Sequence, residues 1–249
     1  MPRPLATLFA PVLRPAIFQR RETRLWPSET EASFHLNGVT LRGWVTNPGA
    51  ERALVYFGGN AEQVGVWRES LVEHFPDHTG YLIAYRGYGA SRGRPTERWL
   101  VADGVALVDE AAGRHPGGVD VVGRSLGSGV AVQVAVARPS VRRLVLVTPF
   151  DSAVAVAQDH VGRFPVTRLM ADRFASFSVA SRIGMPTLVI SAGRDEVVRP
   201  DRTDALVAAL PEGAEVLGFP DADHDSVAHD PSYWPAVRAF LSADPARTN

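Results

Sequence analysis

A serine in a glycine-flanked pentapeptide is the first candidate for chemistry in this sequence. Ser125 is the centre of Gly-Arg-Ser-Leu-Gly at residues 123–127. An apolar run at 119–122 predicts a strand before it, and the Ala/Val-rich stretch 130–137 predicts a helix after it. G-x-S-x-G between a strand and a helix is typical of an exposed serine nucleophile, since glycines tolerate so sharp a turn. The alternative is a glycine-rich turn without chemistry.

A serine hydroxyl needs a base to take its proton, and His224 is the candidate. It follows an apolar run at 216–219 and precedes a predicted helix at 226–241. His229, already inside that helix, is the second choice among seven histidines. The other five are expected in the N-terminal hairpin, at helix ends, in a polar loop (His78) or in a segment of variable appearance: His35, His74, His78, His115 and His160.

A carboxylate must orient the imidazole and stabilise its cation. Asp195 is the first acid after the apolar run 188–190, and Asp151 is the corresponding acid after the run 144–147. We favour Asp195 and keep Asp151 as the alternative. Either aspartate could instead be an ordinary helix N-cap.

The developing oxyanion needs two N–H donors. The Leu126 amide would lie at the start of the helix that follows Ser125, where free donors and the helix dipole favour negative charge. The second candidate is the Asn60 amide, which follows Gly58-Gly59 directly after the apolar run 53–57. A plain turn capped by Asn60 is the alternative.

The elements that must position these residues alternate along the chain. Continuous apolar runs separated by helical patterns indicate parallel strands covered on both faces, hence an α/β fold with its ligand site beyond the carboxyl ends of the strands. Asn37-Gly38 between two alternating runs predicts an N-terminal antiparallel hairpin. The runs are 53–57, 81–85, 119–122, 144–147, 188–190 and 216–219, and the helices are 61–75, 97–114, 130–137 and 226–241.

The length of 249 residues accommodates one catalytic domain at 31–249, preceded by an arm at 1–30 that packs on the body. Residues 148–187 would form a minimal cap of two short helices, at 154–160 and 165–177, over a shallow, open site. Six apolar side chains could line that site or could simply pack the cap onto the body: Phe150, Phe164, Leu169, Met170, Phe174 and Phe177.

Composition excludes several classes of protein. The chain contains no cysteine, and all 26 basic residues are arginine, so disulfides, thiolate metal sites and Schiff-base or P-loop lysines are ruled out. A formal net charge of −1 gives no reason to expect nucleic acid as a partner. The apolar stretch 5–18 is too short and too broken by prolines to span a bilayer. We therefore expect a cytoplasmic protein, with peripheral membrane contact through residues 1–25 as an alternative.

Several segments together resemble the α/β-hydrolase superfamily, and within it the small branch of depalmitoylating thioesterases, lysophospholipid hydrolases and uncharacterised bacterial members. The resemblance covers about residues 30–242. Besides 123–127 and His224, it rests on 56–62, 85–91, 95–97, 149–152 and 193–197.

The resemblance implies a triad of Ser125, Asp195 and His224. It also implies oxyanion donors at Asn60 and Leu126. The residues expected at the substrate loop or beside the substrate are Gly59, Arg86, Tyr88 and Phe150. Many relatives carry histidine where this chain has Gly58, so any hydrogen bond of that histidine is absent.

The expected activity is hydrolysis of carboxylic ester or thioester bonds through an acyl-enzyme, on a small-molecule or acyl-group substrate and without cofactor or metal. A peptidase and a cofactor-free haloperoxidase or perhydrolase on the same triad are alternatives, as is a non-catalytic binding module. The acidic run around His224 could resemble a metal cluster, but alternating carboxylates in a short loop are usually solvated.

Overall fold

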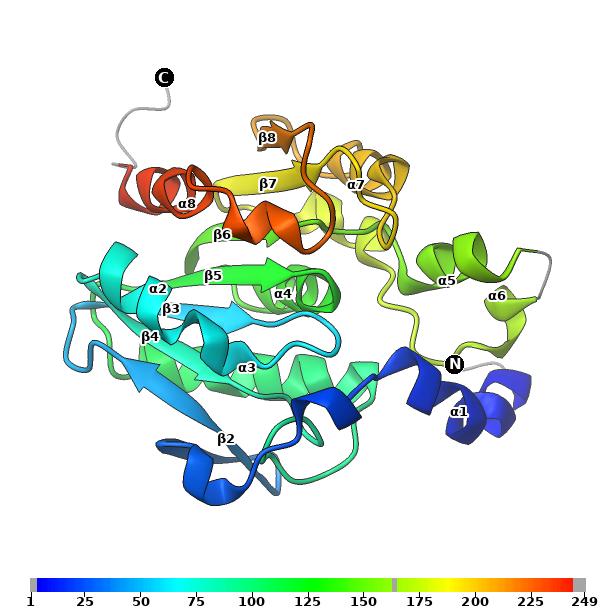
Figure 1. Cartoon of the computed structure of the whole chain (residues 1–249), viewed down its shortest axis with the longest axis horizontal. Coiled ribbons are helices and arrows are strands. Elements are labelled where there is room, and N and C mark those ends of the chain that lie inside the picture. The colour runs from blue at the N-terminus through cyan, green and yellow to red at the C-terminus, as the bar shows by residue number, and fades with distance from the viewer. Residues whose placement is uncertain (1–3, 163–164, 244–249) are drawn as a thin grey trace.

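A computed structural model, which describes residues 4–162 and 165–243, contains one eight-stranded sheet in the order β1-β2-β4-β3-β5-β6-β7-β8 (Figure 1). β2 pairs antiparallel with β1 and β4, and the remaining pairs are parallel. This confirms the α/β class with an N-terminal hairpin. The strands are β1 (Ala32–Leu36), β2 (Val39–Thr46), β3 (Arg52–Phe57), β4 (His78–Ile83), β5 (Val119–Arg124), β6 (Val141–Val147), β7 (Thr187–Ala192) and β8 (Glu215–Phe219).

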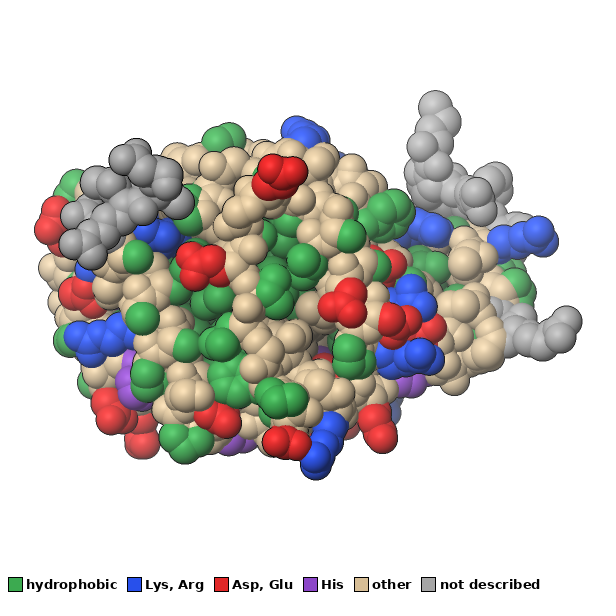
Figure 2. All heavy atoms as spheres, turned by 90° about the horizontal axis from the view of Figure 1, so that it is seen from above, with side chains coloured by type: hydrophobic (Ala, Val, Ile, Leu, Met, Phe, Trp, Pro, Cys, Tyr) green, Lys and Arg blue, Asp and Glu red, His purple; other side chains and the backbone are tan. Residues whose placement is uncertain are grey.

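Helices cover both faces of the sheet. On one face, α3 (Glu97–Ala112), α4 (Leu126–Ala137) and α7 (Pro200–Val207) pack on side chains such as Val55 and Val121. On the other, α2 (Arg68–His74) and α8 (Tyr233–Ser242) pack on Leu54 and Val122. Successive residues of each strand thus enter opposite cores, which explains why the central strands read as continuous apolar runs. The face seen in Figure 2 intersperses acidic, basic and apolar side chains.

Two predicted helices are interrupted. The segment expected as one helix at 61–75 begins with a loop and the 3-10 helix η3 (Val64–Trp67) before α2. The last one is divided into the 3-10 helix η6 (Ser226–His229) and α8. Pro231 explains this second break, because a residue before proline avoids helical geometry and Asp230 is extended, with ψ 132°.

His78 was wrongly placed in a polar loop by the sequence. It is the first residue of β4 and is buried, with Nε2 3.0 Å from Oδ2 of the buried Asp120. Its other ring nitrogen lies 3.0 Å from Asp77 Oδ1. The polar residues around His78 made it resemble a loop residue, but it is a structural histidine that connects β4 with β5 across β3.

The first described element is a helix, α1 (Pro4–Ile17), within the segment that the sequence predicts as an arm. In Figure 1, α1 lies below the cap helices α5 (Ala153–Val161) and α6 (Val166–Leu169), to one side of the sheet. Leu13 and Ile17 pack against a small buried cluster in the cap, and Arg14 Nε donates to Asp172 Oδ2 at 2.7 Å. The helix therefore forms one structural unit with the cap.

The second cap helix is shorter than expected. α6 has four residues, and the rest of the predicted helix 165–177 is irregular apart from the 3-10 helix η4 (Ser176–Ser178). No helix in the described part of the chain is long and apolar enough to cross a membrane.

Candidate active site

Ser125 occupies a strained turn between β5 and α4, with φ 50° and ψ −116°. The turn admits only glycine on either side. A Cβ at residue 123 would lie 2.5 Å from the carbonyl oxygen of Gly127, and a Cβ at residue 127 would lie 1.9 Å from that of Phe57. A positive φ in a non-glycine residue is uncommon, and such strain persists where the surrounding structure holds it. The geometry is that of a nucleophile presented at a sharp strand-to-helix turn.

Ser125, His224 and Asp195 form a continuous chain of hydrogen bonds. His224 Nε2 lies 3.0 Å from Ser125 Oγ, and its Nδ1 lies 2.7 Å from Asp195 Oδ2. An ionised carboxylate only accepts, so Nδ1 carries the proton and Nε2 of a neutral imidazole is free to accept from the serine. The three residues follow or end β5, β7 and β8, whose carboxyl ends meet at one edge of the sheet.

Asp195 is held by its own loop. Its Oδ1 accepts from the amides of Val197 at 2.9 Å and Val198 at 2.7 Å, which leaves Oδ2 for the imidazole.

The alternative acid, Asp151, and the alternative base, His229, have other partners. Asp151 Oδ2 is 3.6 Å from Arg202 Nη1, and His229 packs on the ring of Trp67.

The two candidate oxyanion amides belong to residues at the mouth of one cavity. Asn60, Ser125 and Leu126 all line it. The Asn60 side chain fixes its own loop: Oδ1 accepts from the Gln19 amide at 2.9 Å and from the Tyr88 hydroxyl at 2.8 Å. It also donates through Nδ2 to the Ile17 carbonyl at 2.8 Å. The side chain thus holds its loop against the end of α1 and against Tyr88.

Glu62 and Arg124 connect this loop with His224, and the sequence shows no direct sign of this connection. Glu62 accepts from the Gly59 amide, from Tyr56 OH at 2.8 Å and from the Trp67 indole. Its Oε2 also lies 3.5 Å from Arg124 Nη1. Both side chains are buried, which makes this a strong fixed electrostatic contact between the loop after β3 and the turn at Ser125.

Burial raises the pKa of the Tyr56 hydroxyl, and the neighbouring Glu62 carboxylate raises it further. Tyr56 therefore stays protonated and donates its hydrogen bond across the physiological range. In the sequence, the only sign of this network is that a charged residue lies at each glycine motif: Glu62 shortly after Gly58-Gly59, and Arg124 within residues 123–127.

The residues expected beside the substrate have different surroundings. A Cβ on Gly59 would lie 3.6 Å from Ser125 Cβ, so the backbone there approaches the nucleophile closely. Phe150 lines the cavity. Arg86 is buried, pairs with Asp103 through Nε and Nη2, and among the described residues is not part of the cavity wall.

Tyr88 acts on the cavity indirectly, through Asn60. Burial raises the pKa of its hydroxyl, although the positive charge of Arg20 opposes this, so the hydroxyl remains a donor. Gly58, where many relatives carry histidine, has no room for a side chain, because a Cβ would lie 2.5 Å from Val64 Cγ1.

The cavity beside Ser125 has a volume of about 530 Å³ and largely apolar walls. Of the six apolar side chains that could line the site or pack the cap, Phe150 and Met170 line the cavity. Phe174 is instead fully buried, Phe177 is 53% exposed, Leu169 is absent from the described lining, and Phe164 lies outside the described residues. The wall that the sequence analysis missed comes from α1 and α5: Leu13, Ile17, Ala153, Val156, Ala157 and Val161.

The acidic run around His224 is engaged in other contacts. Asp221 pairs with Arg194, and Asp225 pairs with Arg124. Asp223 Oδ1 accepts from the amides of Ser226 and Asp225, and these bonds lower the pKa of that carboxyl. Within residues 4–162 and 165–243, no group of three or more His, Asp or Glu side chains is placed to hold a metal ion.

Comparison with solved structures identifies the architecture as the α/β-hydrolase fold. A hydrolase from Pseudomonas aeruginosa superposes with a TM-score of 0.69 at 21% identity, over 85% of this chain and 98% of that one. The esterase Pf2001 of Pyrococcus furiosus gives 0.69 at 16% identity, over 88% of this chain and 96% of that one. Likeness at this level of identity establishes the fold alone.

The chain belongs to the serine hydrolase family, since the family model "Serine hydrolase" matches residues 93–243. An uncharacterized protein of Mycobacterium tuberculosis is 34% identical over 196 residues, which are 76% of this chain and 69% of that protein. The alpha/beta hydrolase domain-containing protein aho-3 of Caenorhabditis elegans is 29% identical over 204 residues, 79% of this chain and 59% of that protein. The protein is thus a hydrolase of the serine class.

Proposed function

We propose that this serine hydrolase cleaves carboxylic esters or thioesters with Ser125 as nucleophile, His224 as base and Asp195 as the acid that orients it. One observation carries the proposal: the hydrogen-bond chain from Ser125 Oγ through both nitrogens of His224 to Asp195 Oδ2, with lengths of 3.0 and 2.7 Å. Such a chain is the arrangement that activates a serine hydroxyl.

The reaction begins when His224 Nε2 takes the proton of Ser125 as its oxygen attacks the substrate carbonyl. The resulting oxyanion accepts hydrogen bonds from the backbone amides of Asn60 and Leu126. Each such donor contributes about 3–4 kcal/mol of transition-state stabilisation. His224 then returns the proton to the leaving alcohol or thiol, and an acyl-enzyme remains on Ser125. Water, activated by the same imidazole, releases the acid.

The apolar cavity is proposed to hold the acyl group. Its volume of about 530 Å³ lies within the range of small-molecule sites, roughly 300–1,000 Å³. Its walls come mainly from α1, α5 and α6, and Ser125 and Asn60 also line it. We propose a short acyl chain as the preferred group, as the minimal cap suggests, with the leaving group directed outward.

We propose a cytoplasmic location for the enzyme and keep peripheral contact to a membrane through residues 1–25 as the alternative, which the structure allows us to test. The support is the outer side of α1, where Phe9 and Val12 are 40% and 73% exposed. Apolar side chains on an exposed helix bind the interfacial region of a bilayer. Phe9→Ser combined with Val12→Ser should abolish sedimentation with phosphatidylcholine vesicles, and retention of binding would exclude this contact.

The hydrolytic proposal is tested with p-nitrophenyl esters from acetate to dodecanoate and with the matching acyl thioesters. We expect turnover that is strongest for short chains and absent from folded Ser125→Ala. Turnover that persists in Ser125→Ala would assign the chemistry to another residue. No turnover of any ester or thioester by the intact protein would remove the proposed reaction.

A further inference from the structure

A second cavity, of about 680 Å³, lies between the segment after α1 and the loop at residues 87–93. Four arginines line it, Arg20, Arg21 and Arg24 from the segment and Arg92 from the loop. All four are exposed, and none forms an ion pair with a carboxylate of the described residues. Of the other 19 arginines in the described residues, 11 form an ion pair with a carboxylate.

The scaffold beneath these arginines is fixed. The Gly89 amide donates to Thr23 Oγ1 at 2.9 Å, and Thr23 is buried. The Arg92 amide donates to the Thr40 carbonyl at 2.9 Å, and the Gly87 amide to the Arg92 carbonyl at 3.1 Å. A Cβ on Gly87, where φ is +80°, would come within 3.0 Å of the Gly93 carbonyl oxygen. The loop and the segment are therefore joined before any ligand arrives.

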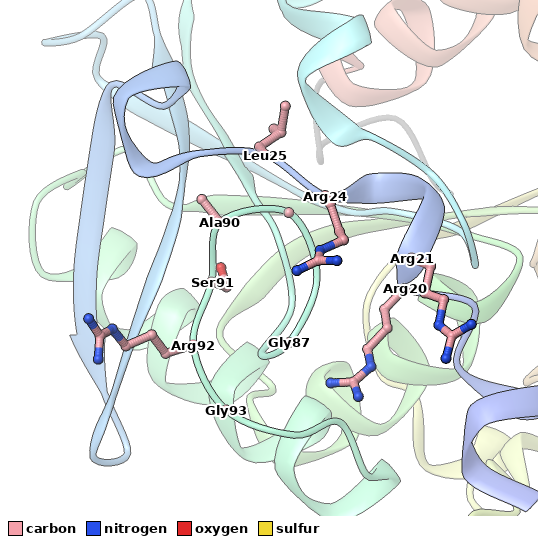
Figure 3. A pocket seen from close by; sticks show the side chains of 10 residues that line it. Arg20, Arg21, Arg24, Leu25, Gly87, Ala90, Ser91, Arg92 and Gly93 are labelled. Carbon is pink, nitrogen blue, oxygen red and sulfur yellow. The ribbon is translucent and has the colours of Figure 1, made fainter.

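The side chains extend from this scaffold in different directions. In Figure 3, Arg20 and Arg24 extend from the segment over the loop, and Arg92 extends outward from the loop itself. Arg21 leaves from the same short 3-10 turn as Arg20 (Figure 3). Leu25 is the single large apolar side chain among the described lining residues, and no acid is among them. The cavity is thus cationic and poorly suited to an acyl group.

We propose that this cavity is a binding site for a phosphate group, with Arg20 and Arg24 as its principal ligands. Guanidinium groups match the oxygens of phosphate through paired N–H donors, and an arginine keeps its charge at every physiological pH. Unpaired like charges on one surface repel one another, and a doubly charged anion removes that repulsion. A neutral ligand would gain neither interaction.

The phosphate site adjoins the triad cavity but is separate from it. Gln19 lines the triad cavity, and the next residue, Arg20, lines the cationic one. The Gln19 amide is also bonded to Asn60, and Tyr88, which follows Gly87 in the loop, braces the same side chain. A phosphate held by Arg20 would therefore lie beside the loop that carries the proposed oxyanion donor. Binding itself needs no member of the triad.

The test is calorimetric titration of the full chain with inorganic phosphate and with glycerol 3-phosphate at constant ionic strength. Arg20→Gln with Arg24→Gln removes the principal ligands. Arg182→Gln with Arg238→Gln removes two exposed positive charges elsewhere and controls for net charge. We expect saturable binding that is weakened about tenfold or more by the first pair and unchanged by the second. Ser125→Ala should bind as the wild type does, whatever its activity.

Sedimentation with phosphatidylcholine vesicles, with and without phosphatidic acid, identifies the source of the phosphate. Saturable binding of the soluble phosphates that depends on Arg20 and Arg24 supports a free phosphate or phosphoester. Vesicle binding that phosphatidic acid strengthens over phosphatidylcholine alone, with the same dependence on Arg20 and Arg24, supports a lipid headgroup. The proposal is overturned if the soluble phosphates do not bind and phosphatidic acid does not strengthen vesicle binding, or if both pairs of substitutions weaken binding equally.

Discussion

Arg124 donates a hydrogen bond of 2.9 Å from Nη2 to the backbone carbonyl oxygen of His224. The residue before the proposed nucleophile thus holds the main chain of the proposed base. The same Nη2 lies 2.8 Å from Asp225 Oδ1. Burial by itself would lower the pKa of the guanidinium, but the charge of Glu62 and the contact with Asp225 raise it above its ordinary value. The positive charge of Arg124 therefore connects the loop after β3, which carries Glu62, with the turn at Ser125 and with the loop after β8, which carries His224.

Replacing Arg124 with glutamine should lower kcat by up to about 100-fold and leave KM nearly unchanged. The side chain is absent from the described cavity wall, but a small displacement of the base is enough to slow proton transfer. Arg124→Lys should be intermediate, since one ammonium cannot reproduce the guanidinium fork. Steady-state kinetics on a p-nitrophenyl ester measure both constants.

Arg142→Gln is the matched control for that substitution. Arg142 Nη2 donates to Asp120 Oδ2 at 3.2 Å and to the Leu241 carbonyl at 3.0 Å. Asp120 lies near the start of β5, at the opposite end of that strand from Ser125. Its loss should lower the thermal midpoint while kcat is retained. A kcat for Arg124→Gln equal to that of Arg142→Gln would show that Arg124 acts only on stability.

Asp195→Asn should reduce kcat by about 10⁴-fold, because an amide no longer fixes the imidazole tautomer or stabilises its cation. The variant keeps an oxygen that can accept from the Val197 and Val198 amides, so the fold should persist. Asp151→Asn tests the alternative acid and should retain most of the activity. A severe loss in Asp151→Asn, with Asp195→Asn active, would reverse the assignment.

Tyr88→Phe should lower kcat a few-fold through the loss of the 2.8 Å hydrogen bond to Asn60 Oδ1. A single such bond is worth about 0.5–1.5 kcal/mol, which sets the size of the effect. Tyr81→Phe removes a comparable buried bond, to His115 Nε2, outside the site. Its kcat should match the wild type. Equal rates for both variants would show that bracing of Asn60 does not affect the reaction.

Ala157→Phe should shift the preference of the enzyme toward shorter acyl chains. Ala157 lines the apolar cavity from α5, and a larger ring there fills space proposed for the distal acyl carbons. We expect kcat/KM for octanoyl esters to fall about tenfold or more, with acetate esters little affected. A uniform decline across the series would mean that the acyl chain lies elsewhere.

The succession of strands along the chain and the three residues of the candidate triad could be predicted because each signal is local. A buried parallel strand is a short apolar run, and Ser125, Asp195 and His224 each stand at or just after the end of one. The hairpin was equally local: Asn37 and Gly38 have φ of 47° and 74°, the left-handed values that this dipeptide favours.

The cavity walls and the supporting network could not be predicted, because they depend on contacts between distant segments. Leu13 and Ile17 meet the cap only in three dimensions, and Pro11 and Pro15 obscure the helical pattern of α1. For Phe174 the sequence left open whether its ring lines the site or packs the cap onto the body, and the ring is buried against Phe18. Apolar character alone does not distinguish a core side chain from a pocket wall.

The most direct test of the account is labelling with a fluorophosphonate probe, followed by peptide mass spectrometry. The probe reacts with an activated serine and needs no knowledge of the substrate. We expect one modified residue, Ser125, in the folded protein, with no modification in Ser125→Ala or in heat-denatured protein. Well-folded protein that resists the probe, or that is labelled at another serine, would contradict the triad of Ser125, His224 and Asp195.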